Sequence, residues 1–291
     1  MPPFQKYRPM WPYVPMFLCG KKLLFSIAFL LLINIATKAA TVDTVSIYSN
    51  AMHKGFKCVV IKPDSYKKKK NIYPVVYLLH GYDGWYSNWI IREPKLKDYA
   101  DQYQLIIVCP DGGKSSWYFD SPVDSTMKYE TYIGKEVPDY IDANYRTIKD
   151  RKARAITGLS MGGHGALFLA FRHSETFGAC GSMSGGVDLN YSRNKFDIMK
   201  RIGDTAQHAD NWKKYIVMNV IESYPKDSLA ITFDCGTEDF YYEANHKLHE
   251  KMLRLKIPHD YTERPGKHNW DYWRNSIKYQ LLYFSEYLIK K

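Results

Sequence analysis

The sequence predicts an α/β fold in which a mostly parallel sheet of about eight strands is flanked by helices. Short apolar runs alternate with helical patterns from residue 41 onward. Most of these runs are apolar throughout, as strands buried on both faces are. A chain of 291 residues with 45% hydrophobic content can bury one large core, so we expect a single domain over residues 40–291.

The strand-like runs and helical patterns follow one another in a regular order. The first two runs, Thr41–Ser49 and Phe56–Ile61, resemble an antiparallel hairpin. The later runs are Val75–Leu79, Leu105–Cys109, Ala153–Thr157, Ala179–Met183, Ile231–Cys235 and His259–Glu263. Helical patterns cover Tyr129–Tyr145, Gly162–Arg172, Tyr241–Leu255 and Trp270–Ile289. Strand and helix therefore alternate as in a parallel sheet.

The stretch Val187–Ser228 interrupts this alternation. It is longer than an ordinary connection and mixes apolar residues with many charges. We interpret it as a small helical insertion before the strand Ile231–Cys235. The sequence is compatible both with a lid over a functional site and with a peripheral excursion.

The first 39 residues have the pattern of a secretory signal peptide. Two lysines precede the apolar run Leu23–Ile33, and small residues follow up to Ala39. We expect cleavage after Ala39 and a secreted or periplasmic protein. The alternatives are an uncleaved N-terminal anchor, and a start at Met16 instead of Met1.

Charge and cysteine content narrow the class of protein. Loss of the five basic residues in 1–39 lowers the formal net charge from +11 to +6. The run Lys67–Lys70 is typical of a solvated loop, so we expect no nucleic-acid partner. Of the five cysteines, Cys19 lies in the predicted signal peptide. The other four lie in apolar runs and are expected to be small, buried hydrophobic residues; they are Cys58, Cys109, Cys180 and Cys235. No metal-binding motif is present, and we expect no metal or organic cofactor.

A candidate nucleophile lies between a predicted strand and a predicted helix. Residues 158–162 read Gly-Leu-Ser-Met-Gly, the G-x-S-x-G pattern of a nucleophile elbow. The turn forces strained torsion angles on Ser160, and side chains at Gly158 or Gly162 would collide with the neighbouring elements. Ser160 is therefore the predicted nucleophile.

A serine hydroxyl needs a base to take its proton, and nine histidines are available. His268 is favoured because it follows the last predicted strand, at the end where open α/β sheets place their sites. His164 lies one turn into the nucleophile helix and is expected to pack there.

The base in turn needs an acid that orients it. Three carboxylates surround the end of the strand Ile231–Cys235. Asp234 should still be in the strand, and Glu238 should point away from the site if Asp239 points inward. We therefore expect Asp239 to be the acid, in the chain order Ser, Asp, His.

The oxyanion of an acyl transfer needs two N–H donors. Met161 supplies one at the helix N-terminus, and Tyr82 supplies the other from the turn His80–Gly84, or else its side chain lines the pocket. His80 is expected to be structural. Aromatic residues at the same strand ends, Trp85, Trp117 and Tyr118, are candidate substrate-binding residues or core residues.

With these residues in place, the chain resembles the esterase D-like family of the α/β-hydrolases, over nearly all of residues 42–288. The family includes feruloyl and acetyl esterases, S-formylglutathione hydrolases and, more distantly, mycolyltransferases and siderophore esterases. The residues that carry the resemblance are Leu78–Gly81, Asp111–Gly113 with Trp117–Tyr118 and Asp120–Pro122, Gly158–Gly163, Cys235–Asp239, and Gly266–Trp270 with Tyr272–Trp273. Lys267 and Asn269 depart from it, since relatives often have Gly and Asp there.

The resemblance implies a carboxylesterase, with the family's triad on Ser160, Asp239 and His268. Export favours small-molecule or glycan esters, such as acetyl or feruloyl groups on external carbohydrate, over a cytosolic thioester. The alternatives are a catecholate siderophore esterase, a sugar acyltransferase, and an inactive carbohydrate-binding protein. The sequence leaves the acyl group, the alcohol and the oligomeric state open, and predicts no stable membrane insertion once the signal is removed.

Overall fold

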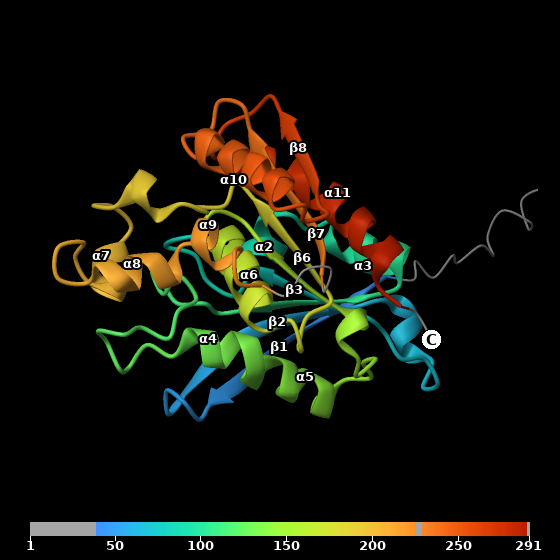
Figure 1. Cartoon of the computed structure of the whole chain (residues 1–291). Helices are drawn as coiled ribbons and strands as arrows, with labels where there is room; N and C mark the ends of the chain where they lie inside the picture. Colours follow the sequence, from blue (N-terminus) through green and yellow to red (C-terminus); the bar gives the residue numbers. More distant parts are fainter. Residues whose placement is uncertain (1–38, 225–228, 290–291) are drawn as a thin grey trace, which may run out of the picture. The chain divides into compact units, whose positions relative to one another are not determined.

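The computed structural model describes residues 39–224 and 229–289. The predicted signal peptide lies outside the described residues except for Ala39. The described part contains an eight-stranded sheet with the order β1-β2-β4-β3-β5-β6-β7-β8 (Figure 1). The first two strands form an antiparallel hairpin, β2 pairs antiparallel with β4, and the pairs from β4 to β8 are parallel. The predicted fold class is confirmed.

Every predicted strand is present, with ends that agree to within two residues. The strands are β1 (Thr41–Ser49), β2 (Lys54–Lys62), β3 (Val75–Leu79), β4 (Ile106–Pro110), β5 (Arg154–Gly158), β6 (Ala179–Met183), β7 (Ala230–Gly236) and β8 (Asp260–Arg264). All residues of β3, β4 and β6 are buried. Their continuous burial explains why these runs are apolar throughout.

The helices are α2 (Asn88–Arg92), α3 (Leu96–Tyr103), α4 (Tyr129–Thr131), α5 (Val137–Asn144), α6 (Met161–Arg172), α7 (Ile198–Ile202), α8 (Ala209–Tyr215), α9 (Val217–Val220), α10 (Tyr242–Arg254) and α11 (Trp270–Tyr287). The predicted helix Tyr129–Tyr145 is divided by a π-helical segment, Tyr132–Glu136. The sequence pattern did not predict α2 and α3, because α2 has only five residues and Pro94 separates it from α3.

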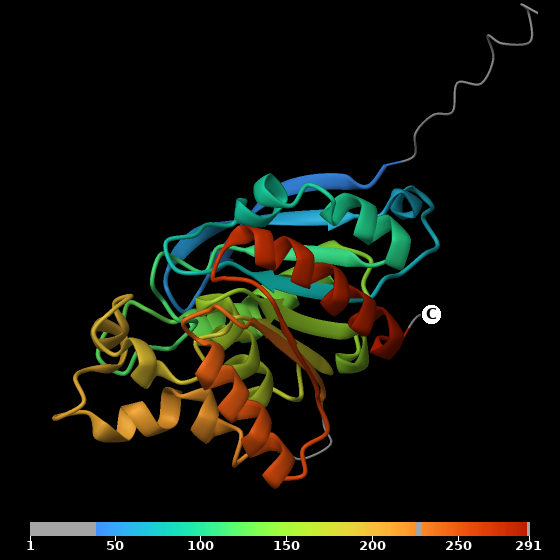
Figure 2. The ribbon, with the colours of Figure 1, turned by 90° about the horizontal axis from the view of Figure 1, so that it is seen from above.

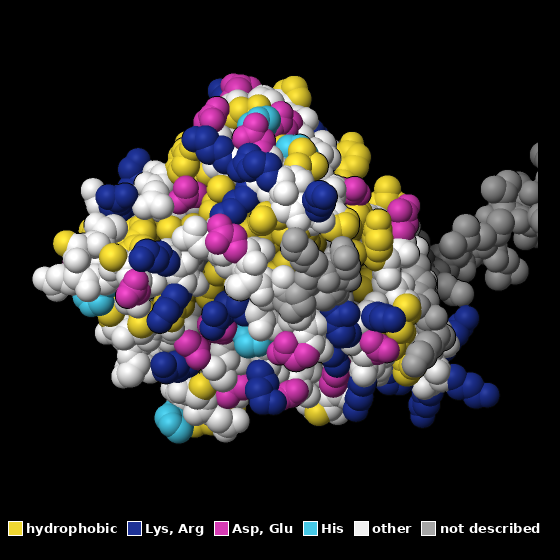
Figure 3. All heavy atoms as spheres, in the orientation of Figure 1, with side chains coloured by type: hydrophobic (Ala, Val, Ile, Leu, Met, Phe, Trp, Pro, Cys, Tyr) yellow, Lys and Arg dark blue, Asp and Glu magenta, His cyan; other side chains and the backbone are white. Residues whose placement is uncertain are grey.

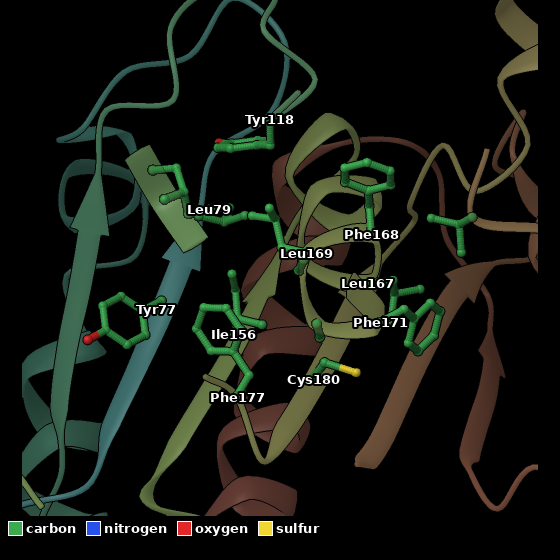
Figure 4. Close-up of a cluster of buried hydrophobic side chains, with 14 of the residues drawn as sticks. Tyr77, Leu79, Tyr118, Ile156, Leu167, Phe168, Leu169, Phe171, Phe177 and Cys180 are labelled. Carbon is green, nitrogen blue, oxygen red and sulfur yellow. The ribbon is translucent and has the colours of Figure 1, made fainter. Parts of the chain in front are cut away.

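Helices cover both faces of the sheet (Figure 2). On one face, α3 and α11 pack against the sheet through residues such as Ala100, Ile277 and Phe284. On the other face, α6 packs with α5 and α10, and Figure 4 shows Leu167, Phe168 and Leu169 of α6 above the strands. The predicted insertion is helical, as α7–α9, and its buried residues join this second core.

The surface carries both signs of charge. Lys and Arg are interspersed with Asp and Glu over much of the face in Figure 3. Four cysteines, Cys58, Cys109, Cys180 and Cys235, are buried and free, as expected. Within the described ranges, no helix is long and apolar enough to cross a membrane.

A buried carboxylate ties α11 to the sheet. Asp234 in β7 is 2% exposed and accepts hydrogen bonds from Ser276 Oγ at 2.5 and 2.6 Å and from Gln280 Nε2 at 2.9 Å. Arg264 Nη1 lies 3.3 Å from Asp234 Oδ1 and supplies the opposite charge. Since both hydrogen-bond donors belong to α11, the network fixes this helix against the C-terminal end of β7.

Replacing Asp234 should therefore destabilise the fold. Asp234→Ala leaves the half-buried Arg264 and the buried side chains of Ser276 and Gln280 without this acceptor, so we expect the free energy of unfolding to fall by about 3 kcal/mol. Urea unfolding followed by circular dichroism measures this value. The control is Asp271→Ala, since that carboxylate is 82% exposed and should change the free energy by less than about 0.5 kcal/mol. Equal effects of the two variants would contradict the role given to Asp234.

Candidate active site

Ser160 occupies a tight turn between β5 and α6. Its φ of 54° and ψ of −115° lie in a region that residues with a β-carbon rarely adopt. A β-carbon at Gly158 would lie 2.6 Å from the carbonyl oxygen of Gly162, and one at Gly162 would lie 2.5 Å from that of His80. Both glycines are thus required for the approach of the turn to its neighbours.

Three predicted residues meet at the C-terminal ends of the strands. His268 Nε2 lies 2.9 Å from Ser160 Oγ. On its other side, His268 Nδ1 lies 2.8 and 3.0 Å from the two carboxylate oxygens of Asp239. The Asp239 side chain is fully buried, whereas that of His268 is 15% exposed. The structure therefore forms a continuous hydrogen-bonded chain from a buried acid, through a histidine, to a serine hydroxyl.

The competing residues have other partners. Asp234 is in β7, as expected, and Glu238 points to the surface, where it lies 3.5 Å from Lys267. His164 is fully buried in α6 with Nδ1 2.9 Å from the Gly186 carbonyl oxygen, and burial lowers its pKa to about 4. A histidine that is neutral and enclosed by the core cannot serve Ser160.

Two backbone N–H groups border Ser160 without an acceptor. Met161 is the first residue of α6, and its buried N–H has no partner inside the helix. Across residues 39–224 and 229–289, neither this N–H nor that of Tyr82 donates to a carbonyl or side chain. Both residues were predicted as oxyanion donors, and both donors are free.

The orientation of the Tyr82 N–H is set by His80. The carbonyl oxygen of Gly81 lies 2.8 Å from His80 Nδ1 and accepts from the Gly84 N–H at 3.1 Å. Because the trans peptide points its C=O and N–H in opposite directions, the N–H of Tyr82 faces away from His80. Gly112 N–H donates to His80 Nε2 at 2.8 Å, which places the ring proton on Nδ1. Burial lowers the pKa of His80, so the ring stays neutral.

A cleft of about 420 Å³ opens beside Ser160 and His268. Its walls are rich in aromatic side chains from several parts of the chain: Tyr82, Trp85, Phe196, Phe240, Trp270 and Trp273. Trp85, one of the candidate substrate-binding residues, is 46% exposed and lies in this wall. The other lining residues include Asp83, Asn88 and Arg92.

Trp117 and Tyr118 are not in the cleft wall, and the structure corrects this prediction. Both are fully buried. Trp117 Nε1 donates to the Phe196 carbonyl oxygen at 2.9 Å, and Tyr118 Oη donates to that of His80 at 2.8 Å. Their positive φ angles, 54° and 63°, turn the side chains into the core, so they support the loops of the site from below.

Four residues of the cleft wall were not predicted to bind substrate. Phe240 follows the acid directly, and Trp270 and Trp273 follow the histidine closely, so proximity to predicted site residues was an available signal. Phe196 had no such signal, because it lies in the insertion, far from any motif.

The arrangement is suited to attack on a carbonyl carbon. His268 can accept the proton of Ser160, and Asp239 can stabilise the imidazolium that forms. The free N–H groups of Tyr82 and Met161 can bind the oxygen that becomes negative. Among the described residues, no group of three or more His, Cys, Asp or Glu side chains could hold a metal ion.

Comparisons with known proteins agree with this chemistry. The family model described as "Putative esterase" matches residues 49–284. Esterase Rv1288 of Mycobacterium tuberculosis is 28% identical over 235 residues, 72% of this chain and 51% of its own length, so the chain spans about half of that relative. The acetyl esterase of Caldicellulosiruptor saccharolyticus is 26% identical over 80% of this chain and 94% of its own.

Solved structures give the same fold. A ferulic acid esterase has a TM-score of 0.74 and 29% identity, covering 86% of this chain and 99% of its own. An S-formylglutathione hydrolase from Agrobacterium tumefaciens has a TM-score of 0.72 and 21% identity, covering 87% of this chain and 97% of its own; at that identity the likeness concerns the fold alone.

The geometry predicts that Ser160 reacts with a fluorophosphonate probe. We expect labelling of one serine per chain and none in Ser160→Ala, measured by intact-mass spectrometry. His268→Asn should react at least about 100-fold more slowly, because the base that takes the serine proton is lost. His246→Asn is the control, since His246 lies on α10 and pairs with Glu263. Unchanged labelling of Ser160→Ala would contradict the assignment of the nucleophile.

Proposed function

Because the chain belongs to the esterase family whose model spans residues 49–284, we propose that it is a serine carboxylesterase that hydrolyses acyl esters through an acyl-enzyme. The observation that carries the proposal is the hydrogen-bonded chain from Asp239 through His268 to Ser160, which opens into the cleft. We also propose export to the periplasm or the exterior, on the signal-peptide pattern of residues 1–39.

The reaction follows from the positions of these groups. Ser160 Oγ attacks the ester carbonyl while His268 Nε2 takes its proton, and the oxyanion lies at the N–H groups of Tyr82 and Met161. His268 then gives the proton to the departing alcohol oxygen, and the C–O bond breaks to leave the acyl group on Ser160. A water molecule then attacks the acyl carbon while His268 Nε2 takes its proton. The bond between the acyl carbon and Ser160 Oγ breaks, His268 returns the proton to Oγ, and the acid leaves.

The aromatic walls support substrates with flat or apolar parts. The rings of Phe196 and Phe240 are nearly parallel, at 21°, with centroids 6.3 Å apart, and Phe240 also lies 4.3 Å from the His268 ring. Planar acyl groups and sugar faces both pack well on such rings. Together with the acetyl esterase and ferulic acid esterase among the similar proteins, this favours acetyl or feruloyl esters of extracellular carbohydrate.

The test is hydrolysis of a panel of esters by the wild type and Ser160→Ala. The panel contains 4-nitrophenyl acetate and butyrate, methyl ferulate, acetylated xylan and a catecholate triester, each with and without an added sugar acceptor. We expect turnover of an acetyl or feruloyl ester, and a loss of at least about 1,000-fold in kcat for Ser160→Ala. Preferred transfer to the sugar would identify an acyltransferase. No serine-dependent turnover of any ester would contradict the proposal.

Variants of His80 test the oxyanion turn, the segment His80–Gly84 that carries the Tyr82 N–H. Asn at position 80 keeps a donor near the Nδ1 position, whereas Gln keeps an acceptor near the Nε2 position. Since the bond to Gly81 orients the Tyr82 N–H, we expect kcat to fall about 100-fold in His80→Gln and less in His80→Asn, with KM changed little. Steady-state kinetics on 4-nitrophenyl acetate measure both constants. A change in KM without a fall in kcat, or an equal kcat in the two variants, would contradict this role.

A further inference from the structure

The cleft wall holds a guanidinium group that the proposed reaction does not use. Arg92 is the last residue of α2 and lines the same cleft as Ser160. Its guanidinium carbon lies 6.0 Å from the centre of the Trp270 ring. Across residues 39–224 and 229–289, its side chain forms no ion pair or hydrogen bond. A cation with unused donors thus borders the space where a substrate would lie.

The scaffold beneath Arg92 is fixed. One turn before it on α2, Trp89 is 1% exposed and donates from Nε1 to the carbonyl oxygen of Leu79 at 2.9 Å. The Trp89 and Trp270 rings meet edge to face, with centroids 5.1 Å apart. The start of the helix is held by Asn88, whose Oδ1 accepts from the Trp85 N–H at 2.8 Å. Arg92 is therefore carried by a helix that is anchored to Leu79, the last residue of β3, and the turn His80–Gly84 begins directly after Leu79.

The carboxylate in this wall, Asp83, does not neutralise the charge of Arg92. Asp83 also lines the cleft, but Lys114 Nζ lies 3.1 Å from its carboxylate, and both side chains are 65% exposed. The positive charge of Arg92 is left without a counter-ion in the described wall. A guanidinium offers parallel N–H groups that match the two oxygens of a carboxylate.

We propose that Arg92 binds an anionic group, of the carboxylate class, on the ester substrate. This inference rests on the proposed esterase function and adds a substrate class to it: esters whose acyl or alcohol part bears a negative charge at a distance from the scissile bond. The Trp270 ring centre lies 6.0 Å from the guanidinium carbon, within reach of a cation–π contact, and the aromatic wall would hold the uncharged part of the substrate.

The test compares esters that differ only in charge. One pair carries the charge on the alcohol side, 4-acetoxybenzoate against 4-acetoxybenzamide. The other pair carries it on the acyl side, mono-4-nitrophenyl glutarate against the corresponding terminal amide. The wild type should prefer the anion in at least one pair, and Arg92→Leu should lower kcat/KM about tenfold more for the anion than for the amide. The anion preference of Arg92→Lys should lie between those of the wild type and Arg92→Leu. Addition of 0.5 M NaCl should reduce the preference of the wild type.

Arg254→Leu is the matched control, because Arg254 is the last residue of α10, is exposed, and does not line the cleft. It removes the same charge from a helix end and should leave the anion preference as it is. The proposal is overturned if Arg92→Leu keeps the wild-type ratio in both pairs, or if Arg254→Leu lowers it equally.

A binding experiment separates this proposal from the esterase proposal. Isothermal titration of 4-acetamidobenzoate into Ser160→Ala and into Ser160→Ala with Arg92→Leu requires no turnover. Weaker binding, by about tenfold, in the second protein supports the role of Arg92 even if no ester is hydrolysed. Equal binding in both, together with equal ratios above, overturns it while the hydrolysis of neutral esters can still stand.

Discussion

The turn at Ser160 depends on two residues that lack a β-carbon. Gly158 and Gly162 let the turn approach the backbone of β3 and its own helix, and no larger residue could occupy either position without moving the backbone. The serine hydroxyl is exposed to the cleft only because this turn is sharp, and the N–H of Met161 is free only because α6 begins directly after it. The nucleophile and one oxyanion donor are thus products of a single close approach.

The sheet brings the remaining groups to this turn. Neighbouring strands β3 and β5 are parallel and in register, with Leu79 opposite Gly158, so the oxyanion turn and the elbow leave the sheet side by side. The same holds for β7 and β8, where Gly236 is opposite Arg264, and the loops that follow them carry Asp239 and His268. Since parallel strands end at one edge, four loops distant in sequence can share one site.

These loops could be predicted from sequence because each has a local signature: a glycine pattern, a strand end, or a histidine after the last strand. The cleft wall could not be predicted in the same way. Trp117 and Tyr118 are aromatic residues at a strand end, yet left-handed backbone angles turn both into the core, and no local pattern shows this. Phe196 reaches the cleft from an insertion whose packing depends on Trp117, 79 residues earlier. Such residues are placed by long-range contacts, which a single sequence does not display.

Three histidines near the site show how surroundings decide what a residue can do. His80 and His164 are both buried, and burial lowers the pKa of each ring. Each has a backbone carbonyl oxygen beside Nδ1, which favours the charged form but outweighs the burial at neither ring. His268 has a buried carboxylate beside Nδ1 instead, and a serine hydroxyl beside Nε2. Of these three rings, only His268 therefore has a carboxylate in contact that stabilises a transient imidazolium. The same side chain therefore orients a peptide at His80, packs a core at His164, and can move a proton at His268.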